Sequence, residues 1–282
     1  MSVVLALSGG GAKAAAHIGA LRALADAGIR PAHIVGTSMG AVVGAAAAAG
    51  VAPAEMLARV GRLTRKDVAA PARLAILGGL YLPALLLPEP LRRTIAALVP
   101  AERFGDLATP LTVTAVDLDS GALCVFGAHG GDAPLVDALY ASCALPMYYP
   151  PAILDGRRYG DGGLRGALPL ATALEVARAL ERGGGAVEAI VAIDIGPGFD
   201  EEGAPPTGGL PTMVRAHDDA TGILMAALAE AQRAEWAADP ARPRLVHVRP
   251  RVERHATFRL DRVTAYEAEG YRAARAALAA LP

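Results

Sequence analysis

Strand-like apolar runs and helix-like segments alternate over the first fifty residues, and this alternation restricts the possible folds strongly. Residues 3–7 are apolar and rich in β-branched side chains, and they stop at the turn formers of residues 8–11. Residues 12–27 carry apolar side chains at helical spacing, and a second apolar run, residues 33–36, precedes the small-residue segment 41–49. The order strand, helix, strand, helix predicts an α/β fold with a parallel sheet.

The rest of the chain continues this pattern. Further strands are predicted at residues 111–116, 123–126, 189–193 and 245–248. Further helices are predicted at residues 170–180, 213–236 and 263–281. Asp155-Gly156 is a hairpin turn signal, so a short antiparallel excursion is expected between residues 153 and 159. Residues 196–211 are rich in Gly and Pro and predict a long surface loop.

Length, charge and cysteine content exclude several classes of protein. A chain of 282 residues, 53% of them hydrophobic, can bury a sizeable core, and no repeat or boundary divides it, so we expect one domain over residues 1–282. A formal net charge of −1 argues against a nucleic-acid partner. Cys124 and Cys143 lie in no metal-ligand spacing, and neither a metal nor an organic cofactor is expected. The N-terminus lacks a basic segment before its short apolar run, which favours a cytoplasmic location.

The apolar segment from Leu74 to Leu91 approaches the length of a membrane span but is broken repeatedly. The interruptions are Gly78, Gly79, Pro83, Pro88 and Pro90. They argue against a continuous transmembrane helix. Two interpretations stay open, burial in the core or an apolar flap over a lipid-binding groove. We therefore expect reversible, peripheral contact with a lipid surface at most.

The residues Gly36-Thr37-Ser38-Met39-Gly40 match the pattern GxSxG between a predicted strand and a predicted helix. In this setting the serine lies on a sharp turn that exposes its hydroxyl, and the flanking glycines let the strand and the helix approach closely. The pattern also occurs as a structural turn, but its position after a strand favours Ser38 as a nucleophile.

The loop Gly9-Gly10-Gly11, after the first predicted strand, is a candidate oxyanion hole. Its backbone N–H groups can point outward, with the positive end of the following helix behind them, and we expect the loop to need unusual backbone angles. Lys13 is a candidate substrate-binding residue, either solvated or in contact with a phosphate head group. The second strand is followed by no acidic residue for a dinucleotide ribose, and Ala12 and Ala14 around Lys13 rule out a Walker A loop.

A nucleophilic serine needs a base, and the chain offers histidines and aspartates. The histidines are His17, His33, His129, His217, His247 and His255. None lies in a turn typical of a catalytic loop, although His217 and His247 have the late position that a triad hydrolase would use. Asp161, between Gly160 and Gly162, can be presented at a strand end to accept the serine proton directly. Asp155 has a similar setting, and spacing alone does not separate the two aspartates.

Several short motifs together resemble the patatin-like phospholipase family. They are Ser8-Gly9-Gly10-Gly11-Ala12-Lys13 with His17-Ile18-Gly19, then Gly36 to Gly40, then Ala141-Ser142-Cys143-Ala144-Leu145-Pro146 and Asp161-Gly162-Gly163. The resemblance implies a three-layer α/β/α sandwich with a mainly parallel central sheet and a Ser–Asp dyad without histidine. In the family pattern Ser38 matches the nucleophile and Asp161 the base, while Gly9, Gly10 and Gly11 match the oxyanion loop. The resemblance thus favours Asp161 over Asp155.

The resemblance also implies hydrolysis of acyl esters, with phospholipids or lysophospholipids as substrates. Asp161 would take the proton while Ser38 attacks, and water would then release the acyl group from Ser38. Two other functions stay open: a transacylase with the same dyad, and a lipid-binding protein without turnover.

Overall fold

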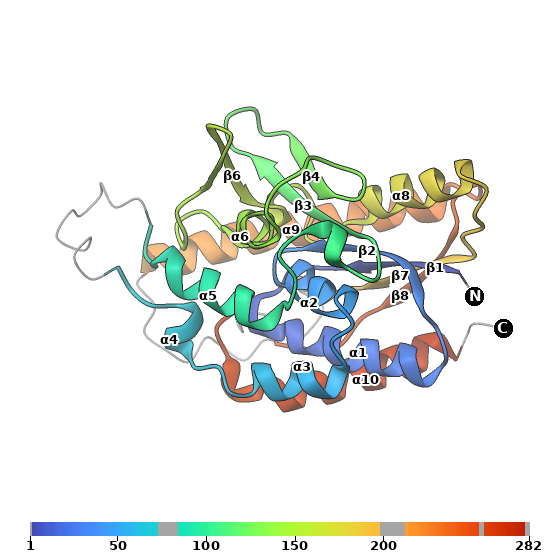
Figure 1. Ribbon diagram of the computed structural model, residues 1–282, viewed down its shortest axis with the longest axis horizontal. Helices are drawn as coiled ribbons and strands as arrows, with labels where there is room; N and C mark the ends of the chain where they lie inside the picture. The colour runs from blue at the N-terminus through green and yellow to red at the C-terminus, as the bar shows by residue number, and fades with distance from the viewer. Residues whose placement is uncertain (1, 73–83, 198–211, 254–256, 280–282) are drawn as a thin grey trace.

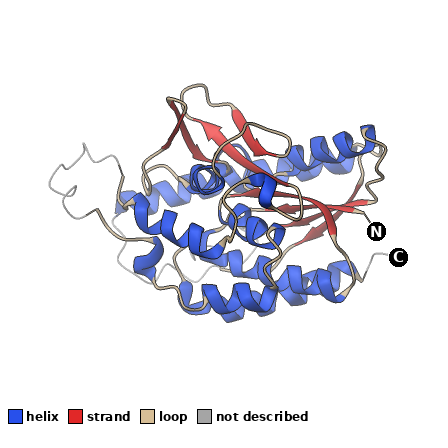
Figure 2. Cartoon of the chain, in the orientation of Figure 1, coloured by secondary structure: helices blue, strands red, loops and turns tan. Residues whose placement is uncertain are grey.

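A computed structural model of the chain describes residues 2–72, 84–197, 212–253 and 257–279. In Figure 1, a β-sheet runs through the middle of the molecule, with α1 (Ala15–Asp26), α3 (Pro53–Val60) and α10 (Val263–Leu278) below it. Helices α8 (Leu170–Arg182) and α9 (Thr212–Ala238) lie on the opposite face of the sheet. Figure 2 shows the same sandwich as red strands between two sets of blue helices. The expected three-layer α/β/α fold is confirmed.

The sheet of the described residues has eight strands in a mixed arrangement. They are β1 (Val3–Leu7), β2 (Pro31–Thr37), β3 (Leu111–Asp117), β4 (Leu123–Gly127), β5 (Ala152–Leu154), β6 (Arg157–Asp161), β7 (Ala189–Ile193) and β8 (Arg244–Val248). The order is β5-β6-β3-β2-β1-β7-β8, and β4 also pairs with β3. The central pairs are parallel, while β4, β5 and β6 form the antiparallel part. Every predicted strand is present.

Alternate residues of β1 face opposite layers of the core. Val3, Leu5 and Leu7 pack in a cluster with residues of α1, α10 and α2 (Met39–Ala48). Val4 and Ala6 pack in a second cluster with residues of α8 and with Trp236 of α9. Because side chains alternate along a strand and both faces are covered, β1 is apolar at every position.

Five α-helices in the described residues lie where the sequence analysis predicted none. They are α3, α4 (Arg65–Val68), α5 (Pro88–Leu98), α6 (Leu135–Cys143) and α7 (Gly163–Gly166). Helix α5 begins with Pro88 and Pro90, which we had counted as interruptions of the segment from Leu74 to Leu91. A proline is favourable in the first turn of a helix, where its missing N–H has no intrahelical partner in any case. The predicted hairpin is confirmed, since Asp155 and Gly156 join β5 to β6 with φ of 49° and 75°.

Two predicted features lie mainly outside the described residues. These are the segment from Leu74 to Leu91, of which residues 84–91 are described, and the loop at residues 196–211. At the described end of the first segment, Leu91 of α5 is buried. Within the described ranges, no helix combines the length and the apolar character needed to cross a membrane.

Candidate active site

Ser38 lies on a strained turn between β2 and α2. Its backbone has φ 54° and ψ −132°, a conformation that L-residues other than glycine rarely adopt. A β-carbon on Gly36 would lie 2.4 Å from Ala41 Cα, and one on Gly40 would lie 2.4 Å from the Ser8 carbonyl oxygen. The two glycines therefore allow the tight strand-to-helix turn, as the GxSxG pattern predicted.

Asp161 reaches Ser38 because β2 and β6 share one edge of β3. Thr37 of β2 pairs with Thr114 of β3, and Asp161 of β6 pairs with the next residue of β3, Ala115. Both Thr114 and Ala115 also pair with β4, which occupies the other edge of β3. The ends of β2 and β6 therefore meet, and Ser38 Oγ donates a hydrogen bond of 2.8 Å to Asp161 Oδ2.

The Asp161 carboxylate is buried and held on both oxygens. Its side chain is 5% exposed, and Oδ1 accepts a hydrogen bond of 2.7 Å from the Gly163 amide. Burial raises the pKa of Asp161 to about 6, although the hydrogen bonds from Gly163 and Ser38 act in the opposite direction. At neutral pH this carboxylate is ionised, yet its proton affinity is high enough to accept the serine proton.

No described histidine is hydrogen-bonded to Ser38 or Asp161. His17 Nε2 donates to the Ser8 carbonyl over 2.8 Å, and burial lowers the pKa of His17 to about 4. His33 contacts Thr112 and stacks on His129, and His247 pairs with Asp194. His217 lies near the Tyr148 ring, and His255 falls outside the described residues.

The glycine loop lies beside the Ser38 turn. A β-carbon on Gly9 would lie 3.1 Å from Ser38 Cβ, and the Gly9 amide donates to the Ala167 carbonyl over 2.9 Å. Within the described residues, the Gly10 and Gly11 amides have no hydrogen-bond acceptor, and both residues line the cavity discussed below. The backbone conformation that favours glycine is at Gly11, with φ 60°, whereas Gly10 has φ 167° and is limited by contact with Ile195.

Ser142 is a polar contact of the site whose role the sequence analysis did not assign. Its hydroxyl is fully buried and accepts a hydrogen bond of 2.7 Å from the Ser38 amide. This contact fixes the backbone of the strained turn from the side of α6. The neighbouring Cys143 remains a thiol, since burial raises its pKa. The only sequence signal for Ser142 was its place in one of the motifs that carry the family resemblance.

Ser38 and Asp161 line a cavity of about 580 Å³ with a largely apolar wall. One side of the wall is formed by aliphatic residues of α2, α3 and α5 and their neighbours: Val43, Val60, Leu63, Leu91 and Leu98. Charged residues line other parts of the wall, among them Arg65, Arg215, Arg259 and Arg262. Lys13 also lines the cavity and is 3% exposed. The described residues contain no group of three or more His, Cys, Asp or Glu that could hold a metal ion.

The fold and this turn define the class: an α/β protein with a serine on a strand-to-helix elbow. A model of the patatin-like phospholipase family matches residues 5–174, and the chain belongs to that family. An uncharacterized NTE family protein of Mycobacterium bovis is 35% identical over 170 residues, which cover 60% of this chain and 44% of the relative. The human omega-hydroxyceramide transacylase is 32% identical over 56% of this chain and 29% of its own length. This chain thus spans less than half the length of these relatives.

Among solved structures, VipD from Legionella pneumophila is similar, with a TM-score of 0.48 and 13% sequence identity. The alignment covers 99% of this chain and 66% of VipD.

Proposed function

We propose that this chain is a serine acyl-ester hydrolase, with phospholipids, lysophospholipids or related carboxylic esters as substrates. The observation that carries the proposal is the hydrogen bond of 2.8 Å from Ser38 Oγ to Asp161 Oδ2 in the wall of the cavity. Membership of the patatin-like phospholipase family supports a lipid ester as the substrate.

In the proposed reaction, Asp161 takes the hydroxyl proton while Ser38 Oγ attacks the ester carbonyl. The Gly10 and Gly11 amides would then donate to the oxyanion, with the N-terminus of α2 nearby as a further positive end. The proton on Asp161 passes to the leaving alcohol as the acyl-enzyme forms. Water then attacks the acyl-enzyme with Asp161 again as base, and Ser38 recovers its proton. No metal or organic cofactor enters these steps.

Acyl transfer is the second candidate function. A transacylase would pass the acyl group from Ser38 to an alcohol instead of water, and the similarity to the human omega-hydroxyceramide transacylase favours this alternative. Product analysis with an added lipid alcohol separates the two: a new ester indicates transfer, and free fatty acid indicates hydrolysis.

We further propose that α9 contacts the lipid surface from which the substrate comes. Thr221, Gly222 and Met225 of α9 line the cavity, while Ile223 and Leu224 on the same helix are 53% and 70% exposed. An apolar face beside the substrate cavity suits a reversible interfacial contact.

The test of this contact is sedimentation with phospholipid vesicles. Leu224→Glu is expected to reduce sedimentation without changing hydrolysis of a water-soluble short-chain ester, and Ile153→Glu, at a similarly exposed apolar residue of β5, serves as control. Equal sedimentation of wild type and Leu224→Glu, or recovery of the protein only as a species resistant to alkaline carbonate, would contradict the contact.

The main test of the function is a screen of p-nitrophenyl esters, lysophospholipids and diacyl phospholipids with Ser38→Ala as control. We expect hydrolysis by the wild type and none above background by Ser38→Ala. A fluorophosphonate probe should label Ser38 in the same preparation. Absence of both labelling and hydrolysis in the folded protein would favour the lipid-binding alternative.

We also propose that residues 1–282 form one catalytic domain, because α10, near the C-terminus, packs on α1 in the described fold. The expected cytoplasmic location stays a prediction, which cell fractionation can test.

A further inference from the structure

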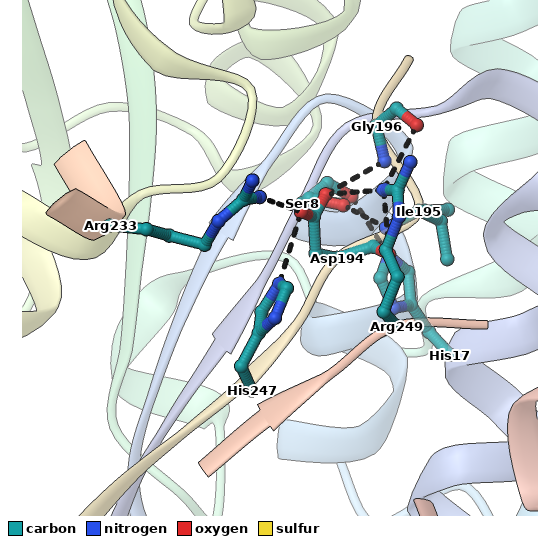
Figure 3. Close-up of polar contacts among 8 residues, drawn as sticks. All are labelled: Ser8, His17, Asp194, Ile195, Gly196, Arg233, His247 and Arg249. Carbon is teal, nitrogen blue, oxygen red and sulfur yellow. Dashed lines mark hydrogen bonds and ion pairs between the residues drawn. The ribbon is translucent and has the colours of Figure 1, made fainter. Parts of the chain in front are cut away.

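A second polar cluster is centred on Asp194 and extends through Ile195 to Ser8, the residue before the glycine loop (Figure 3). Asp194 directly follows β7 and is 2% exposed. Three cationic or potentially cationic side chains reach its carboxylate: Arg233 of α9 at 3.1 Å, His247 of β8 at 3.2 Å and Arg249 at 3.0 Å. The carboxylate therefore joins α9 to the edge of the sheet formed by β7 and β8.

The same carboxylate fixes the backbone that follows it. Asp194 Oδ1 accepts a hydrogen bond of 3.0 Å from the Gly196 amide. Arg249 Nη1 donates to the carbonyl oxygens of Asp194 at 3.1 Å and Gly196 at 3.2 Å. Burial alone would raise the pKa of Asp194, but the hydrogen bond from His247 and the charge of Arg249 outweigh it and lower the pKa to about 2. Asp194 is thus ionised at any pH at which an esterase would be assayed.

Ile195, held between Asp194 and Gly196, contacts the glycine loop in two ways. Its amide donates a hydrogen bond of 2.8 Å to Ser8 Oγ, at the residue before Gly9. Its side chain lies close beside Gly10, since a β-carbon added to Gly10 would approach Ile195 Cδ1 to 2.8 Å. The Ser8 carbonyl is occupied from the other side by His17 Nε2. Ile195 therefore holds Ser8 through its amide and limits the space beside Gly10.

A buried carboxylate with arginine partners is a weak source of net stability, because desolvation of the charges offsets much of their attraction. Apolar residues would fill the same volume at least as favourably. Hydrogen bonds have a direction that apolar packing lacks. Those of Asp194 and its partner Arg249 fix the backbone around Ile195 and Gly196 beside the loop.

We propose that Asp194 is a positioning residue that holds the glycine loop, through Ile195 and Ser8, at the place where its amides meet the oxyanion. This inference rests on the proposed esterase function. Loss of the Asp194 charge frees the Ile195–Gly196 backbone and lets the loop relax. The reaction then loses transition-state stabilisation, while binding of the ester in the cavity stays the same.

The test is Asp194→Asn, which keeps the size of the side chain and removes its charge. We expect kcat to fall by about tenfold or more, since small misplacements of catalytic groups cost up to about a hundredfold, while KM changes by less than about threefold. Hydrogen–deuterium exchange of a peptide covering residues 8–12 should become faster. Ser8→Ala, which removes only the acceptor of the Ile195 amide, should change kcat and exchange in the same direction, and it carries the test if Asp194→Asn does not fold.

The matched control is Asp117→Asn. Asp117 is also a buried carboxylate at a strand end, paired with Arg157 and accepting hydrogen bonds from the Asp119 and Ser120 amides, but it lies on β3, beyond β2 from the glycine loop. The Asp117→Asn variant should be less stable than the wild type. Its kcat and the hydrogen–deuterium exchange rate of residues 8–12 should be unchanged.

Equal losses of kcat in Asp194→Asn and Asp117→Asn would overturn the proposal, as would unchanged kcat or unchanged loop exchange in both Asp194→Asn and Ser8→Ala. Failure of the esterase function itself is recognised separately, because the wild type would then hydrolyse esters no faster than Ser38→Ala.

Discussion

Ser38 and Asp161 are 123 positions apart in the chain, yet Ser38 Oγ and Asp161 Oδ2 are joined by a hydrogen bond of 2.8 Å. The contact exists because β2 and β6 meet end to end along β3. The sheet positions both residues, because Ser38 directly follows β2 and Asp161 is the last residue of β6. The distance between the two side chains therefore depends on how β2 and β6 dock along β3.

The first prediction is that Ser38→Ala and Asp161→Asn each lower kcat/KM by about a thousandfold or more, and that the double variant is scarcely worse than either single one. The reason is that a nucleophile and its base act as one unit. Steady-state hydrolysis of a p-nitrophenyl ester measures this. Asp155→Asn is the control, because Asp155 lies in the hairpin turn with a positive φ that Asn also tolerates. Activity in Asp161→Asn together with its loss in His217→Gln would contradict the dyad.

The second prediction concerns the pH dependence of kcat/KM. The base must be ionised, and burial raises the pKa of Asp161 to about 6. Activity should therefore increase as the pH rises through about 6 and then level off, with a single ionisation on the acidic limb. Initial rates between pH 4 and 8 with a non-ionising ester test this. A limb centred near the ordinary aspartate pKa would show that burial does not tune this carboxylate.

The third prediction is that Asp161→Asn stabilises the folded protein at neutral pH. The pKa of Asp161 is higher in the folded state than the value of 3.8 typical of the unfolded chain, so the folded state binds more protons between pH 4 and 6. Stability from this group is present below about pH 4 and is lost as the pH rises through about 6, at a cost of up to about 3 kcal/mol. Urea unfolding should show a larger gain for Asp161→Asn at pH 7 than at pH 4. A gain that is independent of pH would contradict this account.

The fourth prediction compares two glycines with similar backbone angles. Gly11 has φ 60° and Gly28 has φ 68°, but a β-carbon on Gly11 would lie 2.5 Å from the Thr257 carbonyl oxygen, whereas Gly28 faces open space. Gly28→Ala should cost about 1 kcal/mol of stability and leave activity unchanged. Gly11→Ala should lower kcat by about a hundredfold, because the loop must move. Near-normal kcat in a folded Gly11→Ala protein would show that the glycine loop does not form the oxyanion hole.

The fifth prediction concerns Ser142, whose hydroxyl accepts from the Ser38 amide. Ser142→Ala leaves that amide without an acceptor in a partly buried site, so it should cost about 1–3 kcal/mol and lower kcat. Ser120→Ala removes a hydroxyl that also accepts from a backbone amide, that of Ala122, but on the exposed surface. The two variants are compared by thermal unfolding and by ester hydrolysis. Equal, small effects of both would mean that Ser142 does not hold the turn.

Local sequence patterns predicted those features that depend on local geometry. Residues 3–7 read as a buried strand and form one, and the glycines around Ser38 marked the turn because only glycine fits there. Helix α5 was missed because Pro88 and Pro90 were taken as breaks, although prolines in a first turn permit a helix.

The Asp194 cluster could not be predicted, because its partners come from α9, β8 and the residues after β8, and only the folded sheet brings them together. The Ser142 contact likewise depends on the docking of α6 against the turn.

The end-to-end arrangement of β2 and β6 along β3 has a consequence for the order of events in folding. The antiparallel pairing of β3 with β6 brings Ser38 and Asp161 together, and it forms only after segments far apart in the chain have come into contact. Contacts of large sequence separation form slowly compared with helices. During refolding, the return of ester hydrolysis should therefore lag behind the recovery of the far-ultraviolet circular dichroism signal. In the proposed mechanism, a partly folded chain has Ser38 without Asp161 beside it, and ester hydrolysis should begin only when the sheet is complete.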